Sequence, residues 1–343
     1  RTLVPLLGLI LLLCITSTPV RGVDLERPVD YWVPDDYGTI QDAIDNAPIH
    51  SVIGLSRDLE TTAMTIDLDR PMVIRGQGTG GVTTVRFVNT VGTYDYVFDV
   101  TADHSGLQDL IIEEEYYDIE AGIRVEADFV GINEVEMHGF DERGIWAVGS
   151  SDLEVSYCYL DLNGPIADAI ILHTSPNAHI IGNTITSSLS TGIDLSYSDD
   201  VIIELNEISN CEDDGVHVYS SERATIRDNE ISFCGGGIEL SWSSNADIDG
   251  NLIDQCESYG LLLWNGASDN LVTNNEITNT YLETAGPFGP IITGNGIKID
   301  KIDQPTENNV VKRNLIQDNY VGGYVDISDQ NYIYLNDFID NTE

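Results

Sequence analysis

The sequence predicts an all-β solenoid, a coil of short stacked parallel strands, on the basis of three observations. Asn-centred strings recur between Asn183 and Asn336, mostly at steps of 22 to 24 residues. A Gly-centred string follows most of them after about nine residues, as in GIDLS at Gly192. Within both strings apolar and polar residues alternate, which is the period of a strand with one buried face. Such short strands are stable only when successive turns stack on one another.

The Asn of the first string is expected to lie at an inward turn position. Successive steps between these residues are 23, 23, 22, 24, 39 and 22. At this position each side-chain amide can hydrogen-bond to the amides of the turns above and below. The predicted role is therefore structural and not catalytic. The residues are Asn183, Asn206, Asn229, Asn251, Asn275, Asn314 and Asn336.

The second string supplies another strand to each turn. Its pattern is Gly or Ala followed by inward apolar residues that alternate with outward residues. Together the strings define about nine turns, and with the less regular early region we expect 9–12 turns. The strings begin at Gly122, Gly144, Ala169, Gly192, Gly215, Gly237, Gly260 and Gly296.

The N-terminus carries an export signal in our interpretation. Residues 1–22 contain an apolar run from Leu3 to Ile15 that is too short to span a membrane and is followed by small residues. A lipoprotein signal using Cys14 is the alternative. We therefore expect a secreted, extracellular or cell-surface protein whose mature chain has no membrane span. Because the chain lacks an initial Met and ends inside a repeat, we also expect a fragment of a longer protein.

The chain resembles the right-handed parallel β-helix proteins of the pectin-lyase-like superfamily. More specifically, it is similar to the repeat family of NosD-type and carbohydrate-binding/sugar-hydrolase (CASH) domains, which are built from PbH1 repeats. The resemblance rests on the two strings and on the entry segment VPDDYGTIQDAIDNAP (Val33–Pro48), and it covers roughly residues 30–343. It implies one right-handed β-helix domain over that range. Because the family is functionally mixed, it implies a fold more than an activity.

Three features subdivide this domain. Apolar residues at helical spacing predict a short amphipathic helix near 39–47 that caps the open end of the coil. Residues 50–112 are predicted to form irregular early turns, and residues 113–343 regular ones. The step of 39 residues predicts a loop insertion over 279–295. Strands of the early turns are expected near Met72–Arg75, Thr84–Val88 and Tyr96–Val100.

The charge balance excludes several classes of protein. The chain has 58 acidic against 15 basic residues and a net charge of −43, so it is not expected to bind nucleic acid or anionic membranes. A hydrophobic content of 42% argues against disorder. An Asp-rich, Lys-poor composition is typical of salt-adapted proteins, because high salt screens the repulsion between carboxylates. We therefore expect a halophilic, archaeal surface protein.

Alignment of the Gly strings predicts two columns of outward-facing side chains on one continuous sheet face. The first column is Arg124, Trp146, Ile171, Asp194, His217, Glu239, Leu262 and Lys298. The second column is Glu126, Gly149, His173, Ser196, Tyr219, Ser241, Trp264 and Asp300.

The candidate catalytic residues are Asp194, His217 and Glu239, which fall in consecutive turns of the first column. A His between two carboxylates has its charged form favoured and can act as a general acid or base. If the protein is an enzyme, it is a polysaccharide lyase, an epimerase or a glycoside hydrolase. Carboxylates two turns apart, at ~10 Å, suit a hydrolase poorly, and uronate chemistry needs a cation or Ca²⁺ beside the sugar carboxylate. The alternative is a solvated acidic face without catalysis.

Aromatic side chains on the same face predict a polysaccharide groove, because rings stack on the faces of sugars. The insertion is expected to form a long loop beside Trp264 and Lys298, and long loops on rigid coils commonly carry function. The candidate ligand-binding residues are Trp146, His173, Tyr219, Trp264, Lys298, Asp300, Tyr281 and Phe288.

The sequence predicts no certain cofactor. The adjacent carboxylates of Asp213 and Asp214 are weak Ca²⁺ candidates, with solvated turn residues as the alternative.

Cys211, Cys234 and Cys256 each lie five residues after a ladder Asn, so they are expected to stack in consecutive turns. They form a buried thiol ladder, with one disulfide or a soft-metal site as alternatives.

Three functions remain open from the sequence. The first is an exported or cell-surface protein that binds or processes an extracellular polysaccharide or another component of the cell envelope. The second is a non-catalytic structural or adhesive surface module. The third, NosD-type copper delivery, is disfavoured because the chain has only three Met and six His, and the His residues are scattered. The sequence does not predict an oligomeric state.

Overall fold

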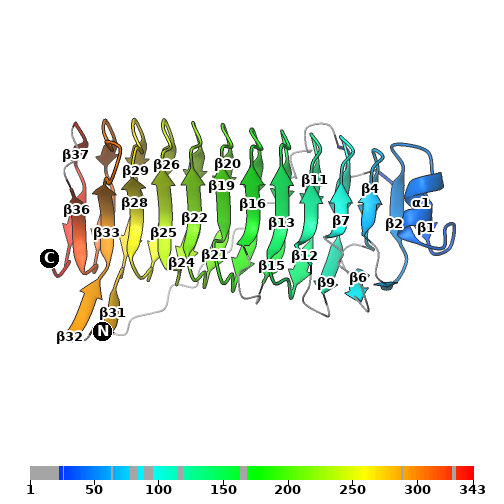
Figure 1. Ribbon diagram of the computed structural model, residues 1–343, viewed down its shortest axis with the longest axis horizontal. Helices are drawn as coiled ribbons and strands as arrows, with labels where there is room; N and C mark the ends of the chain where they lie inside the picture. The colour runs from blue at the N-terminus through cyan, green and yellow to red at the C-terminus, as the bar shows by residue number, and fades with distance from the viewer. Residues whose placement is uncertain are drawn as a thin grey trace, which may run out of the picture.

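A computed structural model describes residues 23–343 except 26, 63–64, 78–82, 89–95, 115–118, 163–167, 287–288 and 327–329. The chain winds into a parallel β-helix of about 12 turns (Figure 1). Three sheets of 13, 12 and 11 strands, here called sheets A, B and C, run along the coil. The predicted solenoid and its number of turns are confirmed. The predicted signal peptide at 1–22 lies outside the described residues.

Sheet A supplies one short strand to every turn, and the two repeat strings did not predict it. Most of its strands have three residues and a buried central side chain, such as Ile203 or Ile226. In spatial order the strands are β1 (Tyr31–Val33), β2 (Val52–Leu55), β5 (Val73–Arg75), β8 (Gly106–Gln108), β11 (Gly131–Asn133), β14 (Glu154–Ser156), β17 (His179–Ile181), β20 (Ile202–Glu204), β23 (Thr225–Arg227), β26 (Asp247–Asp249), β29 (Leu271–Thr273), β34 (Val310–Lys312) and β37 (Tyr332–Tyr334).

Sheet B contains the strands that follow the ladder Asn residues. These strands are β3 (Leu59–Thr62), β6 (Thr83–Val88), β9 (Leu110–Glu114), β12 (Glu136–His138), β15 (Tyr159–Asp161), β18 (Thr184–Thr186), β21 (Glu207–Ser209), β24 (Glu230–Ser232), β27 (Leu252–Asp254), β30 (Glu276–Thr278), β35 (Leu315–Gln317) and β38 (Asp337–Ile339). The first string of the sequence is therefore the corner between sheets A and B together with the sheet B strand.

Sheet C contains the strands of the Gly string, and its outer face carries the candidate site. Its strands in chain order are β4 (Ile66–Leu68), β7 (Tyr96–Val100), β10 (Ala121–Val125), β13 (Arg143–Val148), β16 (Asp168–His173), β19 (Ile193–Ser196), β22 (Asp214–Tyr219), β25 (Gly236–Ser241), β28 (Tyr259–Trp264), β33 (Asn295–Asp300) and β36 (Val321–Val325). The strands expected near 72–75, 84–88 and 96–100 are present as β5, β6 and β7.

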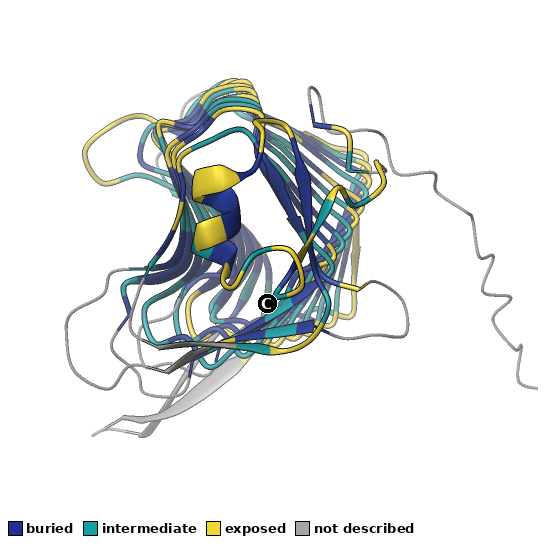
Figure 2. Ribbon diagram, turned by 90° about the vertical axis from the view of Figure 1, so that its right-hand side faces the viewer, coloured by how far each residue is buried: buried dark blue, intermediate teal, exposed yellow. Residues whose placement is uncertain are grey.

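The expected capping helix is α1 (Ile40–Asn46), which covers one end of the coil (Figures 1 and 2). The hydroxyl of Thr39 caps it by accepting a hydrogen bond from the amide of Asp42 at 3.0 Å. Ile40 and Ile44 are buried against the first turns. The helix thus shields apolar side chains that an open coil would expose. Among the described residues, no helix is long and apolar enough to cross a membrane.

The interior is apolar and is bordered by polar ladders. Inward residues of all three sheets form one continuous apolar core, and the exposed residues lie on the outside of the coil (Figure 2). In the Asn ladder, the side-chain amide of Asn206 donates to the side-chain oxygen of Asn229 at 2.9 Å, and Asn229 donates to Asn251 at 2.9 Å. Each side-chain oxygen also accepts from the backbone amide of the preceding ladder Asn. The predicted structural role of the Asn residues is confirmed.

The insertion forms an antiparallel hairpin rather than a long loop. Its strands are β31 (Leu282–Gly286) and β32 (Gly289–Thr293). The hairpin lies between β30 of sheet B and β33 of sheet C. The hairpin therefore leaves the coil at the beginning of β33, near Asn295. Trp264 pairs with Asp300 at the other end of the same strand.

Candidate functional site

The outer face of sheet C has the register that the Gly strings predict. Parallel pairing aligns Asp194 with His217, and His217 with Glu239. The remaining members of the first column also pair in the predicted order. In the second column one position was wrong: Val148, not Gly149, pairs with His173. Gly149 has a φ of 65° and lies one residue beyond the end of β13.

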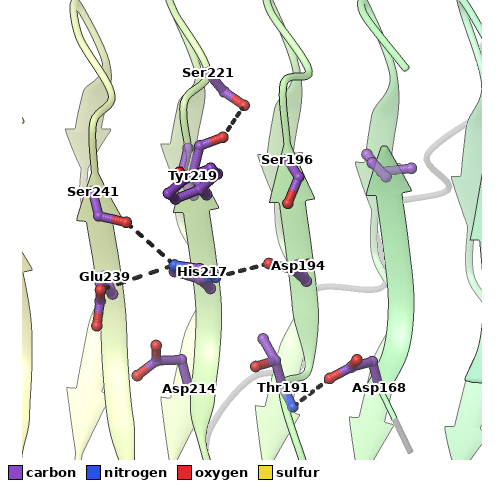
Figure 3. Close-up of polar contacts among 12 residues, drawn as sticks. Asp168, Thr191, Asp194, Ser196, Asp214, His217, Tyr219, Ser221, Glu239 and Ser241 are labelled. Carbon is purple, nitrogen blue, oxygen red and sulfur yellow. Dashed lines mark hydrogen bonds and ion pairs between the residues drawn. The ribbon is translucent and has the colours of Figure 1, made fainter. Parts of the chain in front are cut away.

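His217 lies between two carboxylates from neighbouring turns (Figure 3). Its Nδ1–H donates to Oδ1 of Asp194 at 2.8 Å. On its other side, Nε2 lies 3.4 Å from the hydroxyl of Ser241 and 3.9 Å from Oε1 of Glu239. The three residues come from β19, β22 and β25, so the flat, in-register sheet brings them together. This juxtaposition agrees with the predicted grouping of Asp194, His217 and Glu239.

The surroundings of His217 favour its protonated form. Burial disfavours the imidazolium, but the hydrogen bond that His217 donates to Asp194 and the negative charges of Asp194 and Glu239 outweigh burial and raise the pKa of His217. Its side chain remains 27% exposed. His217 can therefore reach a ligand and exchange a proton with it near neutral pH.

A third column, which the sequence analysis did not identify, lies beside the first. It consists of the residue before the Gly or Ala of each string, and it includes Asp168, Thr191, Asp214 and Tyr259. The signal was present, because this residue can be aligned from turn to turn like the others. The strand pattern gave no reason to expect it to face outward.

Tyr259 links two acids of this region. Its hydroxyl oxygen lies 2.6 Å from Oε2 of Glu239 and 2.8 Å from Oδ1 of Asp214. Asp214 is 4% exposed. Burial and the charge of Glu239 raise the pKa of Asp214 to about 8, against the opposing effect of the Tyr259 hydrogen bond. Burial and the two acids also raise the pKa of Tyr259.

Asp168 adds a partly buried acid near this group. Its Oδ1 accepts a hydrogen bond from the backbone amide of Thr191 at 2.9 Å (Figure 3). Burial raises the pKa of Asp168. Its register partner Arg143 stacks over the ring of Trp146, with the guanidinium carbon 4.7 Å from the ring centre. A cation thus lies at the N-terminal end of the candidate face.

Aromatic rings line the other margin of the face. The ring of Tyr197 makes edge contacts with the rings of His173 and Tyr219, at centroid distances of 5.7 and 5.5 Å. Tyr197 is 52% exposed. It was missed because it follows the last residue of β19, where its φ of 54° turns it back toward the face. Trp264 lies further along the same margin, in register with Ser241 and Asp300.

The remaining predicted ligand-binding residues lie farther from His217 along the coil. Lys298 forms an ion pair with Asp300 at 2.9 Å. Tyr281 is exposed at the base of the hairpin, and the centroid of its ring lies 6.5 Å from that of the Tyr320 ring. The backbone of Tyr281 lies next to Gly294, just before β33, and so at the opposite end of that strand from the Trp264–Asp300 pair beside which it was expected. Phe288 lies outside the described residues.

The candidate metal and thiol positions differ in environment. Asp213 is exposed, whereas Asp214 is buried and bonded to Tyr259. No group of three or more His, Cys, Asp or Glu side chains placed to hold a metal ion occurs in the part of the chain that is described. The expected thiol ladder of Cys211, Cys234 and Cys256 is confirmed, because each follows a sheet B strand in consecutive, in-register turns. The described cysteines are all buried and free. They are Cys158, Cys211, Cys234 and Cys256.

Comparison with solved structures identifies the same architecture in several proteins. The A-module of mannuronan C-5 epimerase AlgE6 from Azotobacter vinelandii is 13% identical, with a TM-score of 0.65 over 87% of this chain and 94% of that one. The periplasmic alginate epimerase AlgG is 14% identical, with a TM-score of 0.64 over 87% and 82%. The Dettilon tailspike protein is 13% identical, with a TM-score of 0.56 over 88% and 63%. At these identities the similarity shows the fold alone.

Sequence comparison gives the same assignment independently. No curated protein matches the chain. Residues 168–338, which contain the His217 site, match the family described as "Right handed beta helix region". This segment, 171 of the 343 residues, is therefore similar to that family, and it lies within the β-helix that the structure shows.

Proposed function

We propose that this protein binds and processes an extracellular polysaccharide on the outer face of sheet C, with His217 as the proton-transfer group. The observation that carries the proposal is the placement of His217 between Asp194 and Glu239, at 2.8 and 3.9 Å. A hydrogen bond donated to a carboxylate orients the imidazole and stabilises its protonated form, and an oriented imidazole can serve in acid–base catalysis. The structural neighbours that are named as mannuronan and alginate epimerases act on polysaccharides, which supports this choice of substrate.

Proton transfer to carbon fits the site better than hydrolysis does. A glycoside hydrolase needs two carboxyl groups with room between them for the sugar and, in inverting enzymes, for the attacking water. Here the imidazole of His217 occupies the space between Asp194 and Glu239. Lyases and epimerases instead move a proton to or from carbon, and His is the side chain that most often acts as the general acid or base in proton transfer. We therefore favour these two reactions.

The charge of the face restricts how a substrate binds. Asp194, Glu239 and Asp168 surround the site, whereas the nearest cation in the third column, Arg143, also pairs with Glu120 at 3.2 Å. An anionic sugar would be repelled unless a cation such as Ca²⁺ accompanied it. The exposed aromatic margin at Tyr197 and Tyr219 offers stacking surfaces for sugar rings of any charge.

The proposal is tested by incubating the protein with a panel of neutral and uronate polysaccharides at high salt. Each reaction is run with Ca²⁺ and with a chelator, and both product formation and binding are measured. We compare the natural chain with His217→Ala and with His179→Ala. His179 is a matched control, because its side chain is also 27% exposed and pairs with a carboxylate, Glu204, at 2.8 Å, but on sheet A.

Three outcomes separate the candidate functions. Turnover that is lost in His217→Ala and kept in His179→Ala supports the proposal. Equal turnover in both variants contradicts catalysis by His217. Absence of binding to every polysaccharide contradicts the whole proposal and favours the second candidate, a structural or adhesive module of a salt-adapted cell surface.

A further inference from the structure

The hydroxyl of Tyr259 has two carboxyl neighbours but only one proton. Its oxygen lies 2.6 Å from Oε2 of Glu239 and 2.8 Å from Oδ1 of Asp214. Both distances are those of O–H···O hydrogen bonds. Because a phenol donates one hydrogen bond, it satisfies one acid as the donor, and the other acid must carry a proton and donate to the phenol oxygen.

The environment decides which acid carries that proton. Glu239 faces the imidazole of His217, and its side chain is 12% exposed, so its ionised form has a charged partner. Asp214 is buried, and the described contacts of its carboxyl group include no Arg or Lys. The groups near Asp214 are Glu239 on β25, Tyr259 on β28, His217 on its own strand, Asp213, and the thiols of Cys211 and Cys256. The proton therefore belongs to Asp214.

Gly236 makes room for this arrangement. It pairs with Asp214 on one side and with Tyr259 on the other. A Cβ at this position would collide with Oδ1 of Asp214 and with the ring of Tyr259. The absence of a side chain on the middle strand allows an acid and a phenol two turns apart to meet.

We propose that Asp214 stores a proton for the site as a neutral acid and, by donating to the oxygen of Tyr259, directs the phenol proton toward Glu239. Asp214 is a positioning residue, since it acts through Tyr259 and Glu239 and is not placed against a ligand. When Glu239 takes the phenol proton, the phenol oxygen takes the proton of Asp214. Glu239 is then the neutral acid and Asp214 the carboxylate, so the total charge is unchanged until solvent returns a proton to Asp214. The catalytic consequence rests on the proposed function, whereas the protonation state does not.

Infrared spectroscopy tests the stored proton without any substrate. The natural chain should show a carboxylic-acid C=O band at neutral pH that disappears with a midpoint near the pKa of about 8 of Asp214. Asp214→Asn should remove this band. Asp254→Asn is the matched control, because Asp254 on sheet B accepts hydrogen bonds from Thr278 and Asn279, and these bonds oppose burial and lower its pKa. Absence of the band, or its persistence in Asp214→Asn, would overturn the proposal.

Kinetics test the relay separately. The amide of Asp214→Asn still donates to Tyr259 but has no acidic proton, so turnover should fall by up to about 100-fold and the alkaline limb of the pH profile should change. Tyr259→Phe breaks the same chain and should give the same profile. An infrared band that behaves as expected, combined with an unchanged pH profile in both variants, would refute the relay. If no polysaccharide is turned over, the infrared result still decides the protonation state, so the two proposals can fail independently.

Discussion

The Nδ1–H of His217 donates to Oδ1 of Asp194 at 2.8 Å, across one step of a parallel β-helix. The pair exists because residues at equivalent positions in consecutive turns face the same direction at a spacing of ~4.8 Å. Glu239 occupies the equivalent position in the next turn, on the other side of the imidazole. A regular stack thus creates a three-residue acid–base cluster from residues 22 or 23 positions apart.

Removal of the Asp194 carboxylate should lower the pKa of His217. Burial alone disfavours the imidazolium, and Asp194 is the first of the partners that oppose burial. Asp194→Asn should therefore shift the titration of His217 to lower pH in an NMR experiment. An unchanged His217 titration would contradict the role assigned to Asp194.

The same pKa shift predicts how stability depends on pH. Because the folded-state pKa of His217 is raised above 6.5, its stabilising effect is complete below pH 6.5 and is lost as the pH rises through the folded-state pKa. The difference in unfolding free energy between the natural chain and His217→Gln should therefore shrink with rising pH over this window. Denaturant unfolding at several pH values measures it, and a difference that grows with pH would refute the assignment.

The Asn ladder should contribute strongly to stability. Asn229→Ala removes hydrogen bonds to Asn206, Asn251 and the carbonyl of Ile203, and it leaves buried polar groups without partners. We expect a loss of about 3 kcal/mol in unfolding free energy. Asn46→Ala is the control, because this exposed residue of α1 bonds only to a carbonyl of its own helix. Its loss should stay below about 0.5 kcal/mol. Comparable losses in both variants would contradict the ladder argument.

Tyr197 should contribute to polysaccharide binding if sugars stack along the aromatic margin. Tyr197→Ala should weaken binding by up to about tenfold, the effect of losing one aromatic contact. Phe233→Ala is a closely matched control: Phe233 is 53% exposed against 52% for Tyr197, and its φ is 56° against 54°. Phe233 follows a sheet B strand, away from the face. Binding constants measured by calorimetry should differ between the two variants, and equal values would remove Tyr197 from the binding surface.

Gly236→Ala should separate Asp214 from Tyr259. The added methyl group collides with both side chains, so we expect a loss of about 1–3 kcal/mol in unfolding free energy and reduced turnover. Gly38→Ala serves as the control, since its added carbon would meet only the end of the flexible Asp42 side chain, at 3.3 Å. Thermal unfolding and turnover of the two variants give the comparison. A Gly236→Ala variant as stable as the natural chain would contradict the close packing of Gly236 against Asp214 and Tyr259.

The sequence by itself determined the coil, the helix that caps it and the register of the site. The repeat of Asn229 and its relatives sets the length of each turn, and strand alternation sets which residues face outward. Equivalent positions must then stack, so the grouping of Asp194, His217 and Glu239 follows from counting residues. Gly149 was misplaced by one residue because β13 ends before it.

Only the tertiary structure decided the contacts that depend on how side chains lean between turns. Tyr259 reaches Asp214 two turns away because Gly236 leaves the space between them empty, and no periodic pattern encodes that reach. The ring of Tyr197 returns to the face because a left-handed residue follows the strand end. Repetition fixes where backbones stack, whereas the meeting of unlike side chains depends on local space and burial, which exist only in the folded coil.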